Sequence, residues 1–384
     1  MAGAKVYDYL IIGAGMAGAS LAYRLRERGA IKVVEAESQA GYHSSGRSAA
    51  MFMETYGTAT IRALTRASRS FFEAPPEGFS EHSLLTDRGV LYIAREGQEA
   101  LLADTLEQLR ATGAEVRTVT ADEVVARVPC VRGEGLIGAI EEADAKDVDV
   151  HALLQGFLKG AKQAGVEFSY GAAVRSAHRD GDGWKVELAS GDTITARVVI
   201  NAAGAWGQQV ADLFGASRIG LQPKRRSAFT FKAAGDADGA WPGIEHWPAV
   251  VGIDESFYFK PDAGQLLGSP ANADPVEPHD VVAEELDIAV GIDRITAATT
   301  LQIRRPNHTW AGLRSFVPDG DFVIGWDGKA SSFFWLVGQG GYGIQTSPGA
   351  SLLASNLVLG EGLDPSLSAE NLDAALVSPS RFAA

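Results

Sequence analysis

Hydrophobic residues dominate the stretch from Val6 to Ile12, and such a run is typical of a strand that is covered on both faces. From Ala17 to Arg28 the apolar residues recur at helical spacing. We expect this helix to end at Gly29, because glycine tolerates the left-handed backbone that closes many helices. A second strand is predicted from Ile31 to Val34. Together these segments predict a βαβ unit of about 30 residues at the start of the chain.

The remainder of the chain alternates between helical and strand patterns. Helices are predicted over 104–112 and 121–128, and a longer amphipathic helix over 148–165. Strands with turn signals follow over 166–206, and residues 221–313 are rich in strands broken by proline and glycine. The C-terminal part returns to strand, glycine loop and helix. This order predicts a nucleotide-binding layer that the chain visits at both ends and in the middle, with a β-rich insertion.

Charge and composition exclude some functions. The chain has 384 residues and a formal net charge of −14, which argues against nucleic acid and against electrostatic attachment to an anionic membrane. The single cysteine, Cys130, leaves no disulfide within the chain and is interpreted as a small buried apolar residue. No apolar run is long enough to span a bilayer, and no signal-peptide pattern is recognised. The histidines show no ligand spacing, so no metal site is expected. We expect a cytoplasmic protein, with peripheral membrane association left open.

A glycine motif lies between the first predicted strand and the first predicted helix. This GxGxxG motif consists of Gly13, Ala14, Gly15, Met16, Ala17 and Gly18. Gly13 allows a tight turn, Gly15 lets the backbone approach a pyrophosphate, and Gly18 permits close packing of helix on strand. The N-terminus of the helix adds unpaired N–H groups and a positive dipole end. Glu35 closes the second strand, where a carboxylate accepts hydrogen bonds from an adenosine ribose. The motif in this context predicts dinucleotide binding.

Two further glycine clusters favour FAD over NAD. Ala203 and Gly204 follow a predicted strand and allow a second close approach of the backbone to a ligand. The other cluster comprises Gly338, Gly340, Gly341 and Gly343. It precedes Thr346 and Ser347, which we predict to be the N-cap pair of a helix. The N-terminus of such a helix suits the electron-rich edge of a reduced flavin.

Seven stretches carry a resemblance to a known family. They are GAGMAGAS, GYHSSGRSAA, LQPKRRSAF, DESFYFKPD, LLGSPANADPVEPHD, RRPNHTWAGLRSF and QGGYGIQTS. In these stretches the chain resembles the FAD-dependent D-amino-acid oxidase and glycine oxidase superfamily, and in particular bacterial D-arginine/D-amino-acid dehydrogenases. The resemblance implies an α/β fold, with a Rossmann-like FAD-binding domain and a discontinuous α+β substrate domain on a mixed or antiparallel sheet. The FAD-binding domain would comprise residues 1–85, 145–215 and 311–384, and the substrate domain 86–144 and 216–310.

The resemblance also implies which residues contact FAD, which would be bound without a covalent link because no cysteine lies near Arg314. The stretch after the second strand would run beneath the flavin. Beyond the GxGxxG motif and Glu35, the contacts implied are Ala36, Ser44, Ser45, Gly46, Arg47, Ser48, Ala49, Ala50, Val174, Ala203, Gly204, Trp206, Gly312, Gly340, Gly341, Tyr342, Gly343, Ile344 and Gln345. His43 is interpreted as a hydrogen-bonded structural residue.

The substrate site follows from the same resemblance. Arg226 and Arg314 stand where the family binds the substrate carboxylate, and arginine offers a two-point hydrogen bond that lysine lacks. Tyr56 and Tyr258 match tyrosines whose hydroxyls approach that carboxylate. The remaining pocket residues implied are Met51, Met53, Val90, Gly341 and Gln345.

The implied activity is oxidation of a D-amino acid by hydride transfer from the α-carbon to flavin N5. The imino acid then hydrolyses to a 2-oxo acid and ammonia. D-Arginine-preferring relatives carry a glutamate at the position of Val90 and polar residues at those of Met51 and Met53, so we expect neutral or hydrophobic D-amino acids. Glu54 would admit a cationic substrate if it faced the pocket, but a solvated position is favoured. No general base is identified.

Several alternatives stay open. The enzyme is expected to be a dehydrogenase, with a quinone, another carrier or oxygen as electron acceptor, but a D-arginine-type or broad-specificity oxidase also fits. Oxidation of sarcosine, glycine or a 2-hydroxy acid is a further alternative. A flavin-bound sensor or binding protein would have the same cofactor motifs without the reaction. A monomer or weak dimer is expected.

Overall fold

The computed structural model describes residues 5–111, 113–233, 241 and 243–382. The first of its two large sheets is built around parallel strands. Their order across the sheet is β20, β12, β1, β2 and β9. The bounds of these strands are Phe333–Val337, Thr193–Asn201, Val6–Ile12, Ile31–Val34 and Glu167–Ser169. Antiparallel partners extend the sheet at β12 and at β20. These partners are β10 (Val174–Asp180), β11 (Gly183–Leu188) and β19 (Val323–Trp326). The βαβ unit expected at the N-terminus is therefore the centre of the sheet.

Helices cover the first sheet on both faces, as the apolar runs of its strands require. One face packs against α1 (Met16–Leu25), α5 (Val150–Gln163) and α8 (Ser347–Leu359), and α2 (Ala59–Glu73) packs on α8. On the other face lies α6 (Gly207–Leu213). The remaining C-terminal elements are α9 (Pro365–Ala369), η4 (Ala374–Val377) and η5 (Pro379–Phe382). Successive side chains of β20 serve opposite faces, with Phe334 in one core and Trp335 in the other.

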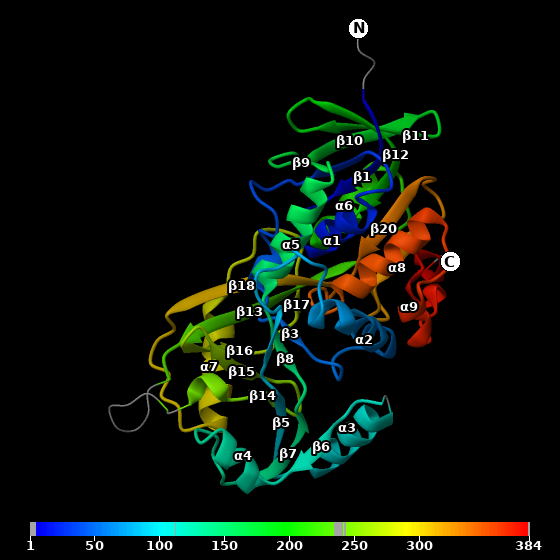
Figure 1. Ribbon diagram of the computed structural model, residues 1–384. Coiled ribbons are helices and arrows are strands. Elements are labelled where there is room, and N and C mark those ends of the chain that lie inside the picture. Colours follow the sequence, from blue (N-terminus) through cyan, green and yellow to red (C-terminus); the bar gives the residue numbers. More distant parts are fainter. Residues whose placement is uncertain (1–4, 112, 234–240, 242, 383–384) are drawn as a thin grey trace.

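The second sheet is mostly antiparallel and lies at the other end of the molecule (Figure 1). Its strand order is β17, β13, β16, β15, β14, β5, β7 and β6, with β18 paired to β13. In that order their bounds are Asp274–Pro275, Gln222–Phe231, Gln265–Ser269, Tyr258–Asp262, Ala249–Gly252, Val90–Arg95, Leu136–Glu142, Arg117–Val119 and, for β18, His308–Phe316. Only β14 and β5 run parallel among the described pairings of this sheet. This sheet confirms the expected α/β fold with a second, mixed-sheet unit.

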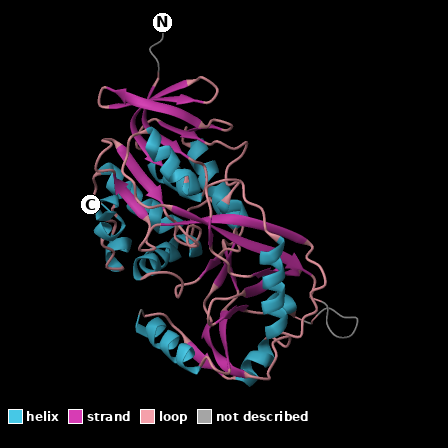
Figure 2. Ribbon diagram, turned by 180° about the vertical axis from the view of Figure 1, so that it is seen from behind, coloured by secondary structure: helices cyan, strands magenta, loops and turns pink. Residues whose placement is uncertain are grey.

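Among the described residues, three α-helices and one short helix accompany the second sheet, and Figure 2 shows the molecule from behind. They are α3 (Glu99–Ala111), α4 (Ala121–Arg127), α7 (Glu285–Ala298) and η3 (Ile244–His246). A small sheet lies between the large ones and consists of β3 (Met51–Phe52), β8 (Lys146–Val148) and β4 (Leu85–Asp87). Within the described residues, no helix is long and apolar enough to cross a membrane.

Two of the four expected domain boundaries fall within paired strands. The boundary at 85/86 lies inside β4, and the one at 310/311 lies inside β18. Since β18 pairs with β13 from His308 to Phe316, its whole length belongs to the second sheet by hydrogen bonding. The division into domains stays a prediction, but its last boundary crosses a continuous strand.

Some helix ends differ from those predicted. The first helix ends at Leu25 rather than at Gly29, and Gly29, with φ of +137°, lies in the turn before β2. Helix α3 starts at Glu99, before the predicted residue 104, and the predicted end at 112 lies outside the described residues. Helices α4 and α5 lie where the sequence predicted them. Asp149 caps α5, because its side chain accepts a hydrogen bond from the Ala152 amide.

We expect Gly18→Ala to destabilise the fold. A Cβ at Gly18 would lie 1.9 Å from the carbonyl oxygen of Gly13, so α1 would have to move away from β1. Overpacking of this kind costs about 1–3 kcal/mol of unfolding free energy. Denaturant titration of the FAD-free protein measures it. Gly362→Ala is the matched control, because nothing lies within 4 Å of a Cβ there. Equal stability of both variants would contradict the close packing of α1 on β1.

Candidate functional site

The candidate site lies at the carboxyl ends of the parallel strands, the edge at which open α/β sheets bind ligands. A cavity of about 530 Å³ opens there. Its walls include the loops that follow β1, β2, β12 and β20. The glycine motif therefore meets the other glycine clusters in space, although they are far apart in the sequence.

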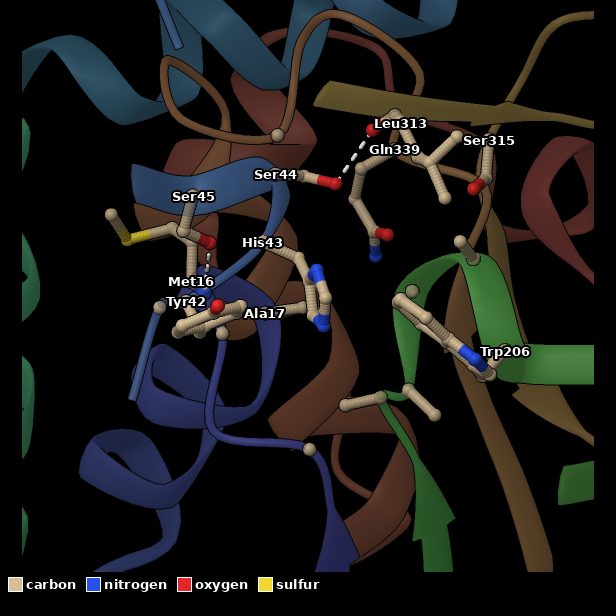
Figure 3. Close-up of a pocket in the computed structure, with 18 of the residues that line it drawn as sticks. Met16, Ala17, Tyr42, His43, Ser44, Ser45, Trp206, Leu313, Ser315 and Gln339 are labelled. Carbon is tan, nitrogen blue, oxygen red and sulfur yellow. Dashed lines mark hydrogen bonds between the residues drawn. The ribbon is translucent and has the colours of Figure 1, made fainter. Parts of the chain in front are cut away.

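The turn after β1 leaves its inner side free for a ligand. Gly13 has φ of +105°, and a Cβ there would meet the Ala202 carbonyl oxygen at 2.4 Å. Gly15 differs, because its φ of −72° suits any residue and a Cβ would meet only Ser45 Oγ, at 3.3 Å. The Ser45 hydroxyl also accepts a hydrogen bond from the Met16 amide, 2.9 Å away (Figure 3). The backbone of Gly15 is thus open to the cavity, as close approach of a pyrophosphate requires.

Glu35 is held rigidly at the cavity wall. Its two carboxylate oxygens accept hydrogen bonds from the amides of Ala14 at 2.7 Å and Glu37 at 2.9 Å. Each oxygen keeps a lone pair for a further donor. His43 lies 2.8 Å from the Glu37 carboxylate, which is the structural hydrogen bond expected for it. Its ring also lies between those of Tyr42 and Trp206 (Figure 3).

The stretch Ser44–Arg47 forms the short helix η1 and joins the two large sheets. The Ser44 hydroxyl donates to the carbonyl oxygen of Leu313 at 2.6 Å. Arg47 donates to the Asp280 carboxylate and to the carbonyl oxygens of Val281 and Ala311. Arg47 borders the cavity, but these bonds occupy its guanidinium with residues of the second unit. The small residues of the GYHSSGRSAA stretch therefore let the chain contact β18 as well as the cavity.

Most of the predicted cofactor residues border this cavity. Those that do are Gly13, Gly15, Met16, Ala17, Glu35, Ala36, Ser44, Ser45, Arg47, Ser48, Ala49, Val174, Ala203, Gly204, Trp206, Gly312, Gly340, Gly341, Gly343 and Ile344. Four of the predicted residues border neither this cavity nor the smaller one that continues from it; they are Ala14, Gly18, Gly46 and Tyr342. Gly18 and Gly46 instead permit close contacts with the backbone of Gly13 and Gly41. Tyr342 packs its ring against Tyr56 and Phe316.

Other wall residues gave no signal in the sequence. They include Arg175 on β10, Gln209 on α6 and Gln339 in the last glycine loop. The helix α8 begins at Ser347 as expected, but Thr346 and Ser347 do not cap it with their side chains. Their hydroxyls instead donate back to the carbonyl oxygens of Tyr342 and Ile344.

A smaller cavity of about 110 Å³ continues from the large one. The residues that border both cavities include Arg226, Tyr258, Arg314 and Gly341. Arg226 on β13 is paired with Gly312 on β18, two residues before Arg314, so both arginines point from the same face of the sheet. A Cβ at Gly341 would lie 2.9 Å from Arg314 Nη1, so glycine there makes room for the guanidinium.

The two arginines have no acidic partner among the described residues. Arg314 donates to the Tyr56 hydroxyl at 3.2 Å, and Arg226 donates to the carbonyl oxygen of Asn272. Burial lowers the pKa of Arg226, and the nearby Arg314 lowers it further. Burial raises the pKa of the Tyr258 hydroxyl, but the positive charges of the two arginines outweigh this effect and lower the pKa below its usual value. Two adjacent cations without a counter-ion make this wall a strong site for an anion.

The substrate pocket expected from the sequence needs one correction. Val90 borders neither cavity, because its side chain is fully buried in the core formed with Met53 and Tyr92. Tyr92, two residues further along β5, borders the smaller cavity instead. Met51, Met53, Gly341 and Gln345 border it as expected. The resemblance placed Val90 in the pocket by its position in the sequence, but it could not show that in this chain the Val90 side chain packs into the core beside Met53 and Tyr92.

The smaller cavity also has charged residues that the sequence did not point to. Glu255 and Lys260 border it, and the Lys260 ammonium donates to Asp147 at 2.6 Å. Glu54 borders neither cavity; its carboxylate accepts a hydrogen bond from Arg69 at 2.8 Å. The pocket is therefore less apolar than expected, and its acid is Glu255. Across the described ranges, no group of three or more His, Cys, Asp or Glu side chains is arranged to hold a metal ion.

The larger cavity fits FAD. Glycine turns line it, a fixed carboxylate lies at its wall, and the side of Gly15 that a Cβ would fill faces the space. Cys130, the cysteine of the chain, lies in the core of the second sheet, where burial raises the pKa of its thiol to about 12.

Comparisons with known proteins agree with this geometry. A profile of the family described as FAD dependent oxidoreductase (DAO) matches residues 8–357. The chain is 23% identical to FAD-dependent oxidoreductase domain-containing protein 1 of Bos taurus, over 92% of this chain and 81% of that protein. It is 24% identical to the glycine oxidase of Bacillus licheniformis, over 93% and 94%.

A solved structure extends the likeness to the fold. The crystal structure of glycine oxidase from Geobacillus kaustophilus has a TM-score of 0.82 with 21% sequence identity, covering 98% of this chain and 99% of that one. The family profile spans nearly all of both sheets and the whole wall of the larger cavity. The chain therefore belongs to the DAO family of FAD-dependent oxidoreductases.

Proposed function

We propose that this chain oxidises the α-amino group of D-amino acids. FAD, when bound in the larger cavity, supplies the acceptor for the hydride of the α-carbon. The product is an imino acid, which hydrolyses to a 2-oxo acid and ammonia. The substrate would lie in the smaller cavity, against the shared wall of the two. The protein holds it in position there and excludes water from the reacting atoms.

The observation that carries this proposal is the unpaired arginine pair. A carboxylate is the planar anion that guanidinium groups bind at two points, and it would supply the negative counter-charge that Arg226 and Arg314 do not have in the protein. The hydroxyls of Tyr56 and Tyr258 lie beside the same arginines and would donate to the carboxylate. An α-amino acid held in this way presents its amine and its α-carbon to the remainder of the cavity.

The residues that would hold FAD come mainly from the loops after β1, β2 and β20. The backbone around Gly15 would bind the pyrophosphate at the N-terminus of α1, and Glu35 would accept from the ribose. The walls formed by Ser44–Ala49 and Gly340–Ile344 would enclose the flavin. We propose a non-covalent cofactor, since Cys130 lies in a separate core.

Neutral side chains suit the smaller cavity best. Met51, Met53 and Val251 supply apolar wall, while the Lys260 ammonium would repel the guanidinium of D-arginine. Glu255 is exposed at the edge of the cavity, where water screens its charge. The preference for neutral D-amino acids therefore depends on the methionines and Lys260 rather than on Val90. Dehydrogenase activity, with a quinone or another carrier as acceptor, is proposed from the resemblance of the sequence.

Oxidation of glycine or a small secondary amine is the second candidate. The small volume of the cavity and the likeness to glycine oxidases favour it. Such a substrate has the same carboxylate, so the arginine pair would bind it equally well.

Anaerobic mixing with a panel of amino acids tests the proposal directly. We expect neutral and apolar D-amino acids to bleach the flavin absorbance, with D-arginine much slower. Faster bleaching by glycine or sarcosine would favour the second candidate. Lack of bleaching by any amino acid would exclude both. Admission of air afterwards separates an oxidase, which reoxidises rapidly, from a dehydrogenase.

Arg314→Leu and Arg226→Leu are expected to impair the reaction strongly. Each removes one of the two buried cations that would bind the substrate carboxylate, at a cost of about 3–5 kcal/mol, or at least about 100-fold in kcat/KM. Arg314→Lys keeps the charge but loses the two-point bond, so an intermediate loss is expected. Arg305→Leu is the matched control, because Arg305 is exposed and borders neither cavity. Unchanged kcat/KM in an arginine variant would remove that arginine from the site.

Gly15→Leu is expected to abolish FAD binding without unfolding the protein. Its backbone angles suit leucine, and the new side chain would project into the cavity past Ser45. The measurements are the flavin-to-protein absorbance ratio and the free energy of unfolding of the FAD-free protein. A stable variant that keeps a full complement of FAD would show that the cofactor does not approach Gly15.

A further inference from the structure

A chain of hydrogen bonds leads from the smaller cavity to a buried acid. Tyr92 borders the cavity, and its hydroxyl lies 2.9 Å from Thr55 Oγ1. The Thr55 hydroxyl in turn contacts one carboxylate oxygen of Glu142 on β7. The other oxygen accepts from the Glu54 amide at 2.7 Å. Glu142 is 5% exposed and forms no ion pair among the described residues, which is costly for a carboxylate.

The direction of these bonds is set by their protons. Thr55 has one hydroxyl proton and donates it to Glu142, so its oxygen accepts the proton of Tyr92. The Tyr92 oxygen then keeps its lone pairs for a donor in the cavity. A substrate ammonium is such a donor. It must also lose a proton before its α-carbon can give up a hydride, because a neutral amine stabilises the developing imine.

We propose that Tyr92, Thr55 and Glu142 form a relay that accepts a proton from the substrate amine, a role that rests on the proposed function. The substrate N–H bond breaks as a Tyr92 O–H bond forms. The proton of Tyr92 moves to Thr55, and the proton of Thr55 moves to Glu142. The result is a neutral amine and a neutral Glu142 carboxyl, with both hydroxyls restored and no electrons transferred.

The charges around Glu142 fit a proton acceptor. Burial raises the pKa of Glu142 above the usual glutamate range, and the nearby Glu54 adds to the effect. Arg62 on α2 lies close enough to interact with both Glu142 and Tyr92, and its charge favours the carboxylate form at rest. Burial and Glu142 raise the pKa of Tyr92 well above its usual value, so Tyr92 passes a proton on and does not stay ionised.

The other polar residues of the smaller cavity are less suited to this role. Lys260 is a cation paired with Asp147, and Glu255 is exposed to solvent. Tyr258 is the main competitor, because the arginines lower its pKa. Its hydroxyl, however, lies beside the guanidinium groups that would hold the substrate carboxylate, and the proposal assigns it to that carboxylate.

The test is the pH dependence of anaerobic flavin reduction by a D-amino acid, in the wild type and in Glu142→Gln. Glutamine keeps the size and hydrogen bonds of Glu142 but accepts no proton. We expect the variant to be slower by about 100-fold near neutral pH and to recover as the pH approaches about 10, where free amines lose their proton to water. A merely structural role would lower the rate equally at every pH.

Two further variants and a control keep the test decisive. Tyr92→Phe and Thr55→Val should give the same shift in the pH profile, and Thr55→Ser should restore the wild-type profile. Glu141→Gln is the matched control, because Glu141 is equally buried on β7 but pairs with Arg117 and Arg127. If wild-type flavin is not reduced, the proposed function fails and the relay with it. If the flavin of the wild type is reduced but the pH profile of Glu142→Gln is not shifted, the relay alone is overturned.

A second readout needs no turnover. 2-Methylalanine has no α-hydrogen and cannot be oxidised, so its binding isolates the proton transfer. Infrared difference spectra should show the carbonyl band of a protonated carboxyl when it binds to the wild type and to Glu141→Gln. The band should be absent in Glu142→Gln. The same band in Glu142→Gln would assign the proton to another group and overturn the proposal.

Discussion

The unpaired positive charge of Arg226 and Arg314 is the constraint on which the site depends. Like charges at close range repel, and the pairing of β13 with β18 keeps the two guanidinium groups close despite this repulsion. The protein supplies them with hydroxyl and carbonyl oxygens but with no carboxylate among the described residues. A ligand can supply the missing anion, and this is why we propose that the substrate binds at this wall.

The loops of the first sheet form the rest of the site. The parallel strands of this sheet end at one edge, so the loops after β1, β2, β12 and β20 come together in space although they are far apart in the sequence. The short helix η1 then connects that edge to β18 through Ser44 and Arg47. Because Arg314 lies on the same strand, the larger and the smaller cavity share one wall. A change at η1 would therefore affect both cavities.

Burial has opposite consequences for the two kinds of charge in the site. The arginines stay charged when buried, and their charges lower the pKa of Tyr258 beside them. Glu142 has no partner of this kind in direct contact, so burial raises its pKa. The site thus has a permanently cationic wall for a carboxylate, and a separate acid whose charge can change. Under the proposed function, this separation would allow one end of an amino acid to be held while a proton leaves the other.

The sequence alone determined the βαβ unit, the FAD motif and the family, because these depend on short segments with strong local preferences. Apolar runs, glycine spacing and the terminal Glu35 act within some 30 residues. Arg226, Arg314, Tyr56 and Tyr258 came from resemblance, and the structure gathers them at one wall. Only the tertiary structure decided the depth of Val90, the partner of Glu54 and the contacts of Thr55 with Glu142. Those depend on how β5, β7 and the loop before α2 pack together, and residues 37 to 87 positions apart carry no local signal of such contacts.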